Sequence, residues 1–316
     1  MNLFPSRRAR TTGATIALLS VAALLAGCSA PADSDTAAPA ESESQEPIGT
    51  DSIPGTFDQA IADLLPADIA AAGKIVSVGG PGYAPFYLLA DDGETLVGND
   101  PEFLRAAGDV LGVEIEFQAL GFDASIPALQ SGRVDMAAGA FSITPDRLAV
   151  VDFVSYFAGG TSLIVPTGNP KDIGLETMCG QTIAVQQGTV YADDYMPIFN
   201  DECVAAGEDE ITISVFPTQP DATLALSTGR ADASMSDYGP LAYVAERSNN
   251  QLEVLAENYD PSIWGYGFPQ GSELSVAIAA AFNALMEDGT YGEILDKWGV
   301  SDGAVTEAEV HTSVTG

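Results

Sequence analysis

Arg147 is well placed in this sequence to bind an anion. It follows Thr144 and Pro145, residue types that respectively cap a helix and suit its first position. The first turn of a helix presents free N–H groups and the positive end of the helix dipole. A guanidinium beside such donors is suited to bidentate binding of a carboxylate. The alternative is a surface Arg paired with one of the 45 acidic residues.

A second possible anion site follows the strand predicted at 181–188. Gly188 allows a ligand to approach the backbone closely, and Thr189 is placed to cap the next helix. Many strand–helix turns contain a similar pair, so this pattern is a weak indication.

Asp237 could bind a cation, because it follows the strand predicted at 231–236. Opposite Arg147, this carboxylate would suit a zwitterion whose ammonium group binds Asp237. The alternative is a turn residue whose side chain caps a helix that begins at Tyr238.

Four aromatic residues follow predicted strands in the N-terminal half: Tyr83, Phe86, Phe122 and Phe141. Aromatic side chains on such loops can form walls for the apolar part of a ligand. Burial in the core is the usual alternative, and it is the interpretation that we adopt for Phe86.

A repeated segment indicates which elements position these residues. ALQSGRVD at 128–135 returns 97 residues later as ALSTGRAD at 225–232. In each copy an amphipathic run ends at a Gly, as helices do, and leads into a strand of small residues. The strands are predicted to end at Ala140 and Asp237, and ligands of open α/β sheets bind at such ends. The repeat therefore predicts two similar lobes that face one cleft.

Strands and helices alternate along the chain, which indicates an α/β fold with mainly parallel sheets flanked by helices. A second strand–helix cycle, starting at 181–188, is inserted in the first. The chain therefore crosses between the lobes twice, near 160–168 and 260–269. Two crossings can act as a hinge that closes around a ligand.

The N-terminus has the composition of a bacterial export signal. Three arginines precede the apolar run 14–26, which is short and rich in small residues compared with a typical membrane span. The run ends in LAGC, which resembles a lipobox, so Cys28 is predicted to carry a lipid anchor. The alternative is an ordinary signal with an incidental Cys. Residues 29–50 lack aromatic side chains and have the composition of a tether.

These patterns predict the organisation of the whole chain. It comprises a lipoprotein signal peptide at 1–27, a disordered tether at 28–56, a first lobe at 57–163 and 268–300, a second lobe at 164–267, and a C-terminal tail at 301–316.

The formal net charge of −34 argues against nucleic acid and anionic lipid as partners. A cationic partner or a solvated acidic surface would both fit this charge. The acidic residues are dispersed, and the single His, His311, lies near the C-terminus, so we expect no metal and no cofactor. With Cys28 assigned to lipid, Cys179 and Cys203 are expected to form a disulfide, which would stabilise by about 3 kcal/mol. Two free buried thiols are the alternative.

The order and spacing of several motifs resemble the polar amino-acid type of periplasmic solute-binding proteins, the bacterial extracellular receptors of ABC importers. The motifs are GYAPF (82–86), LVGND (96–100), IPALQSGRVDMAAG (126–139), SITPDR (142–147), VQQGT (185–189), MSDYGP (235–240) and DGTYGEILDKWG (288–299). Each motif is weak alone, but together they cover the chain after the tether. The resemblance implies a two-lobed, type II periplasmic-binding-protein-like fold.

The resemblance also implies a role for each site residue. Arg147 would bind the α-carboxylate together with the backbone N–H groups of Ser142 and Thr189. Asp237 and the carbonyl group of Ala140 would hold the α-ammonium. Tyr83 and Phe122 would sandwich the ligand's side chain, and Phe141 and Gly188 complete the predicted contacts.

Some positions depart from the family pattern. Gly80 stands where members that select basic amino acids carry an acidic residue, which argues against Lys, Arg or His as the ligand. Asn99, Val190 and Tyr191 also differ from the residues common at their positions. Together these departures favour an uncharged, partly apolar side chain.

The sequence therefore predicts a monomeric, lipid-anchored protein on the extracytoplasmic face of the cell membrane. It would capture an amino acid or related zwitterion by hinge closure and deliver it to an ABC permease. A receptor for a membrane signalling protein is the alternative. An enzyme such as a lyase would need a general acid or base in the cleft, and no His is available there, so no catalytic residue is predicted.

Overall fold

The computed structural model of the protein describes residues 50–256 and 259–312, which belong to one compact unit, Glu46–Gly316. The predicted signal peptide, Cys28 and most of the predicted tether lie outside the described residues. No helix within the described ranges is long and apolar enough to cross a membrane.

The first lobe is built on three parallel strands. β1 (Lys74–Gly79) lies between β4 (Glu114–Ala119) and β5 (Met136–Ser142). Side chains alternate between the faces of a strand, so Ile75 and Val78 of β1 belong to different buried clusters. α3 (Asn99–Leu111) and α9 (Leu274–Asp288) pack on the Ile75 face, and α4 (Phe122–Gln130) packs on the Val78 face.

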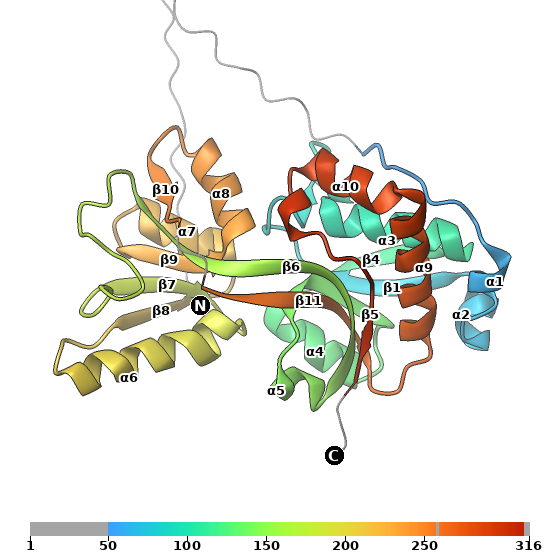
Figure 1. The fold of residues 1–316 in the computed structure, drawn as a ribbon, viewed down its shortest axis with the longest axis horizontal. Helices are drawn as coiled ribbons and strands as arrows, with labels where there is room; N and C mark the ends of the chain where they lie inside the picture. Colours follow the sequence, from blue (N-terminus) through green and yellow to red (C-terminus); the bar gives the residue numbers. More distant parts are fainter. Residues whose placement is uncertain (1–49, 257–258, 313–316) are drawn as a thin grey trace, which may run out of the picture. The chain divides into compact units, whose positions relative to one another are not determined.

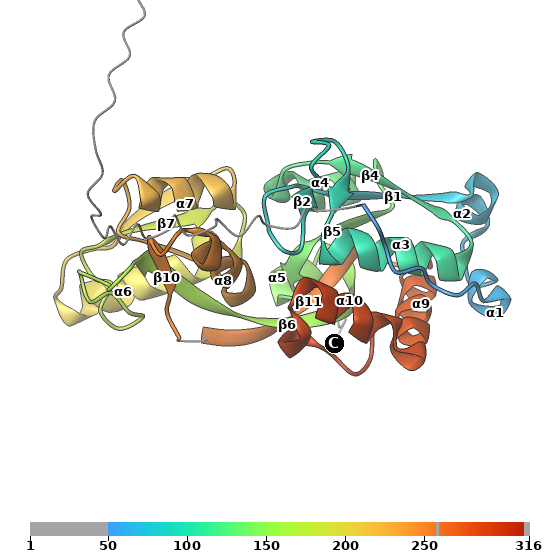
Figure 2. The ribbon, with the colours of Figure 1, turned by 90° about the horizontal axis from the view of Figure 1, so that it is seen from above.

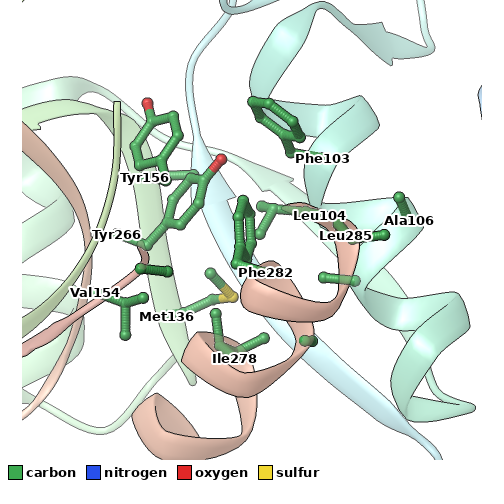
Figure 3. Close-up of a cluster of buried hydrophobic side chains, with 14 of the residues drawn as sticks. Phe103, Leu104, Ala106, Met136, Val154, Tyr156, Tyr266, Ile278, Phe282 and Leu285 are labelled. Atoms are coloured by element: carbon green, nitrogen blue, oxygen red, sulfur yellow. The ribbon is translucent and has the colours of Figure 1, made fainter. Parts of the chain in front are cut away.

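The Ile75 face carries a large cluster of buried side chains (Figure 3). Phe103 of α3 and Phe282 of α9 pack against one another and against the stacked rings of Tyr156 and Tyr266. The two tyrosine rings lie 4.0 Å apart between centroids. This cluster joins the helices of the first lobe to the two longest strands.

The second lobe repeats the same arrangement. β7 (Thr182–Gln186) lies parallel to both β8 (Thr212–Phe216) and β9 (Ala233–Asp237). Its Ile183 and Val185 pack towards α6 (Met196–Ala206), whereas Ala184 packs towards α7 (Gln219–Ser227). Cys203 of α6 forms a disulfide with Cys179, which confirms the predicted pair.

Two long antiparallel strands connect the lobes, β6 (Val151–Pro166) and β11 (Tyr259–Pro269) (Figures 1 and 2). They give the continuous sheet the order β4-β1-β5-β11-β6-β9-β7-β8. β6 pairs with β11 in the first lobe and with β9 in the second. The predicted α/β fold with two crossings is confirmed.

The remaining elements are short. They are α1 (Gln59–Ala62), α2 (Ala67–Ala72), β2 (Leu88–Leu89), β3 (Leu96–Val97), α5 (Pro145–Leu148), the π-helix η1 (Tyr191–Tyr195), α8 (Tyr238–Arg247), β10 (Leu252–Val254), α10 (Thr290–Trp298), the 3-10 helix η2 (Ser301–Gly303) and β12 (Val310–His311). Two of them, β10 and β12, extend the sheet by pairing with β6.

Three of the predicted boundaries need correction. Trp264 and Tyr266 are buried in the core of the first lobe, so the second crossing lies near residue 260 and not at 267/268. Residues 301–312, predicted as a C-terminal tail apart from the lobes, belong to the first lobe, because Ala308 is buried in its core and β12 pairs with β6. The tether ends before Ile53, whose N–H group donates to Glu102 Oε1 at 2.8 Å. In each case a tertiary contact orders a segment with little periodicity of its own.

Candidate functional site

The repeated segment forms the same contacts in both lobes. The carboxylate of Asp135 accepts a hydrogen bond from the N–H of Val76 on β1, at 2.7 Å. Its repeat equivalent, Asp232, accepts one from the N–H of Thr182 on β7, at 2.9 Å. Each bond fixes the turn after a helix to the central strand of the lobe, so the following strands, β5 and β9, end at comparable places.

The repeated arginines have a local structural role. Arg133 Nε donates to Ser131 Oγ and Arg230 Nε donates to Thr228 Oγ1, at 3.3 and 3.2 Å. Both arginines are exposed. The glycine between each pair has a positive φ, 66° in the first copy and 71° in the second, which ends the helix as the pattern predicts.

The carboxyl ends of the parallel strands in both lobes border one cavity of about 370 Å³. This volume is typical of a small-molecule site. The first lobe contributes the segments after β1 and β4 and the end of β5, and the second contributes the segments after β7 and β8 and the end of β9.

Seven of the nine predicted ligand-binding residues line this cavity: Tyr83, Phe122, Ala140, Ser142, Arg147, Thr189 and Asp237. The ring of Phe141 is buried behind that of Phe122, with which it stacks at 4.5 Å. Gly188 accepts a hydrogen bond from Arg147 through its carbonyl group. The structure thus brings all nine residues together, with Phe141 and Gly188 behind the cavity wall.

Arg147 is held in the cavity wall by backbone carbonyl groups. Its NH1 group donates to Ser142 O at 2.9 Å and its NH2 group to Gly188 O at 3.2 Å. The guanidinium carbon lies 5.6 Å from the ring centre of Phe122 and 5.5 Å from that of Phe141. Within the described ranges no carboxylate lies within 4.0 Å of Arg147. Burial lowers the pKa of the guanidinium, which remains charged.

The predicted helix start near Arg147 is present but short. Thr144 Oγ1 accepts a hydrogen bond from the N–H of Arg147 at 3.3 Å, and Pro145 begins α5. α5 has four residues, so its dipole is a small part of the site's positive potential. At the other predicted helix start, Thr189 Oγ1 accepts from the N–H of Ala192 at 3.4 Å, at the beginning of a π-helix.

Asp237 ends β9 and is 4% exposed. It precedes α8, but its side chain makes no capping hydrogen bond there. The carboxylate instead accepts a hydrogen bond from the hydroxyl of Tyr83, in the opposite lobe. Burial raises the pKa of Asp237 to about 7, although the hydroxyls of Tyr191 and Tyr83 and the charge of Arg147 act in the other direction.

Ala140 lies in the cavity wall with an unusual backbone conformation. Its φ is 56°, in the left-handed region that residues with a Cβ seldom adopt. β5 continues to Ser142, so Ala140 is not the last residue of the strand as predicted. Strained backbone of this kind is concentrated at functional sites.

Hydrogen bonds join the two lobes beside the cavity. Besides the Tyr83–Asp237 hydrogen bond, Arg147 of the first lobe bonds to Gly188 of the second, and Gln187 Nε2 donates to Asp123 Oδ2 at 3.1 Å. Residues on both sides of a hinge thus meet directly.

The segment 217–220, after β8, also lines the cavity, and none of the sequence motifs given above includes it. It contains Gln219, which is buried at the start of α7. The rule that places sites after the carboxyl ends of parallel strands could have found it. Within the described ranges, no group of three or more His, Cys, Asp or Glu residues could hold a metal ion.

Residues 75–301 match the family of bacterial extracellular solute-binding proteins, family 3. The chain belongs to this family. The arginine-binding protein ArgT of Corynebacterium glutamicum is 30% identical over 308 residues, which are 98% of each chain. The L-cystine-binding protein TcyJ of Escherichia coli is 26% identical over 219 residues, covering 68% of this chain and 79% of TcyJ.

Solved structures agree with this assignment. An ancestral arginine-binding protein bound to arginine has a TM-score of 0.65 and 31% identity, covering 72% of this chain and 98% of that one. The ancestral amino acid-binding protein AncCDT-1, a precursor of cyclohexadienyl dehydratase, has a TM-score of 0.66 and 27% identity, with 73% and 97% covered. As a family 3 protein, this chain is an extracellular solute-binding protein with the two-lobed fold.

Proposed function

We propose that this protein binds an α-amino acid between its lobes and delivers it to an ABC permease. One observation carries the proposal. Arg147, which lacks a carboxylate partner among the described residues, and the buried Asp237 border the same cavity from opposite lobes. Opposite charges on the two walls match the two charges of a zwitterion.

The α-carboxylate would bind to Arg147. Two of the five N–H donors of the guanidinium are used by the carbonyl groups of Ser142 and Gly188, which orient its plane. The remaining donors can form a bidentate pair with a carboxylate. The rings of Phe122 and Phe141 and the neighbouring backbone exclude water and strengthen this interaction.

The α-ammonium would bind to Asp237 and to the carbonyl group of Ala140. A buried carboxylate with a pKa of about 7 lacks full charge compensation, and an ammonium group would provide it. Hydrogen bonds to charged groups contribute about 1.5–3 kcal/mol each. Ion pairs at both ends of the ligand can therefore reach micromolar affinity, about −8 kcal/mol.

Ligand binding would also hold the lobes together. Arg147 and Asp237 lie in different lobes, which are connected by the two strands β6 and β11. A zwitterion that contacts both residues stabilises the closed arrangement by its own binding energy.

Isothermal titration calorimetry with single variants tests this site. Arg147→Ala and Asp237→Ala are each expected to weaken binding of the best amino-acid ligand by at least about 100-fold, from the loss of a charged pair. Arg133→Ala, which removes the exposed repeat arginine, is the matched control and should bind normally. Near-native affinity in both cavity variants, or no binding of any amino acid by the wild type, would refute the proposal.

We propose further that the mature protein is an anchored monomer without catalytic activity. The lipobox-like sequence at Cys28 and the family's extracellular location support the anchor. Metabolic labelling with a fatty acid, lost in Cys28→Ser, tests it. The relatives named above as binding proteins favour transport over catalysis. Release of a product from an amino-acid mixture would contradict this.

A further inference from the structure

The charges of the cavity wall restrict the ligand's side chain. Among the described residues that line the cavity, Arg147 and Asp237 are the charged ones, and the proposed function assigns both to the α-groups. A cationic or anionic side chain would therefore find no counterion among the described residues of the cavity wall, and its partial desolvation there would be unfavourable. The lining favours an uncharged side chain.

The position of Gly80 cannot hold a charged side chain without a movement of the backbone. A Cβ atom at this position would lie 2.7 Å from the backbone oxygen of Leu120. The contact is with backbone and not with the end of a flexible side chain, so a larger residue would require the chain to move. The wall near Gly80 therefore lacks the space for a carboxylate that could pair with a cationic ligand.

Gln219 supplies an acceptor without a partner. It is 4% exposed and lines the cavity. Its Nε2 group donates to Ser234 Oγ at 3.2 Å, and that hydroxyl donates its own proton to Ala184 O at 2.9 Å. Since the hydroxyl proton is used, the amide must present its nitrogen to Ser234. Oε1 of Gln219 is then left buried and without a hydrogen-bond partner in the described structure.

A buried acceptor without a partner is costly. Oε1 has almost no contact with solvent in this structure, so a ligand can donate to it only after the amide group turns towards the cavity. The free energy gained by pairing the acceptor favours that rotation. Among the residues that line the cavity and are described, Gln219 is the one with such a side-chain atom. Leu120, Phe122 and Val190 provide apolar contacts for the methylene groups of a side chain.

We propose that Gln219 determines the ligand specificity, by accepting a hydrogen bond from an uncharged side chain such as the carboxamide of glutamine or asparagine. This inference rests on the proposed function. It distinguishes the protein from the relatives named for arginine, although they share its fold.

The test compares ligands that differ in the donor. Wild-type protein is titrated by calorimetry with L-glutamine, L-asparagine, L-methionine and L-arginine. Glutamine and methionine are similar in length, but the side chain of methionine has no donor. We expect the better of the two carboxamide ligands to bind about 10- to 100-fold more tightly than methionine or arginine, the range for one unmade buried hydrogen bond.

Substitutions at the same position complete the test. Gln219→Met should reduce the preference for the carboxamide ligand over methionine to about threefold or less, and Gln251→Met, an exposed control in the same lobe, should keep it. Gln219→Glu adds a carboxylate and should raise the affinity for arginine relative to glutamine by at least about tenfold. Thermal unfolding of each variant verifies that it is folded.

Two results would overturn the inference and leave the proposed function intact. One is a wild type that binds amino acids but prefers methionine or arginine; the other is a folded Gln219→Met that keeps the original preference. Failure of the wild type to bind any amino acid would refute the proposed function itself, and with it this assignment.

Discussion

Asp237→Asn should make the protein more stable at alkaline pH while preventing ligand binding. Burial raises the pKa of this carboxyl from 3.8 to about 7. The folded state therefore holds the proton more tightly than the unfolded state, and the wild type loses stability as the pH rises from about 4 to 7. A difference of about 3 pKa units corresponds to about 4 kcal/mol once the pH exceeds 7.

The Asn side chain has nearly the same shape and cannot ionise. Its carbonyl oxygen can still accept the hydrogen bond from Tyr83, so the packing around residue 237 should be retained. We expect Asp237→Asn to be about 2–4 kcal/mol more stable than the wild type at pH 8. Near pH 4 the difference should be below about 1 kcal/mol, because Asp237 is then protonated in the folded state and only partly ionised in the unfolded state.

Differential scanning calorimetry measures this effect. At pH 8 the unfolding midpoint of Asp237→Asn should rise by about 5–10 °C, and near pH 4 the two proteins should unfold within about 3 °C of each other. Asp201→Asn, on the exposed side of α6, should follow the wild type at both pH values. An Asp237→Asn midpoint at or below that of the wild type at pH 8 would show that the buried carboxylate does not destabilise the fold.

Two further predictions concern ligand affinity and the disulfide. The ligand's ammonium group requires an ionised Asp237, whose pKa is about 7, so the affinity for the ligand should fall about 20-fold between pH 7.5 and pH 5.5. Equal affinities at the two pH values, measured by calorimetry, would contradict Asp237 as the partner of the ammonium group. Replacing Cys179 and Cys203 together by Ser removes a disulfide between residues 24 apart and should lower the free energy of unfolding by about 3 kcal/mol, measured by guanidinium denaturation. Ligand binding should be retained, because neither residue lines the cavity. An unchanged free energy of unfolding would refute this prediction.

Local chemistry made much of the site predictable. The cap formed by Thr144 depends on residues three positions apart, and the structure confirms it. The repeat predicted equivalent strand ends, and Asp135 and Asp232 do make matching bonds. The cap involves only neighbouring residues, and each Asp bond joins one helix–strand turn to one strand. Both features can therefore be recognised from the sequence pattern.

The extent and surroundings of the same elements were less predictable. α5 ends after four residues, because the chain turns directly into β6, and no composition signal marks that point. Phe122 and Phe141 were both predicted to follow strands, yet Phe122 begins α4 and lines the cavity, whereas Phe141 lies within β5 and is buried behind it. Which ring faces a cavity depends on the packing of α4 against the sheet, and this is a property of the assembled lobe.

The sequence by itself determined the α/β alternation, the two-lobed organisation, the disulfide pair and the family, because strand and helix periods and the repeated turn chemistry are local. Tertiary structure decided where β11 belongs, which group of the first lobe contacts Asp237, and that Gln219 keeps an unpartnered oxygen. Those outcomes depend on contacts between segments that are far apart in the sequence and that the two connecting strands, β6 and β11, bring together. Burial and charge compensation at such meeting points are set by three-dimensional packing, which a pattern along the chain does not record.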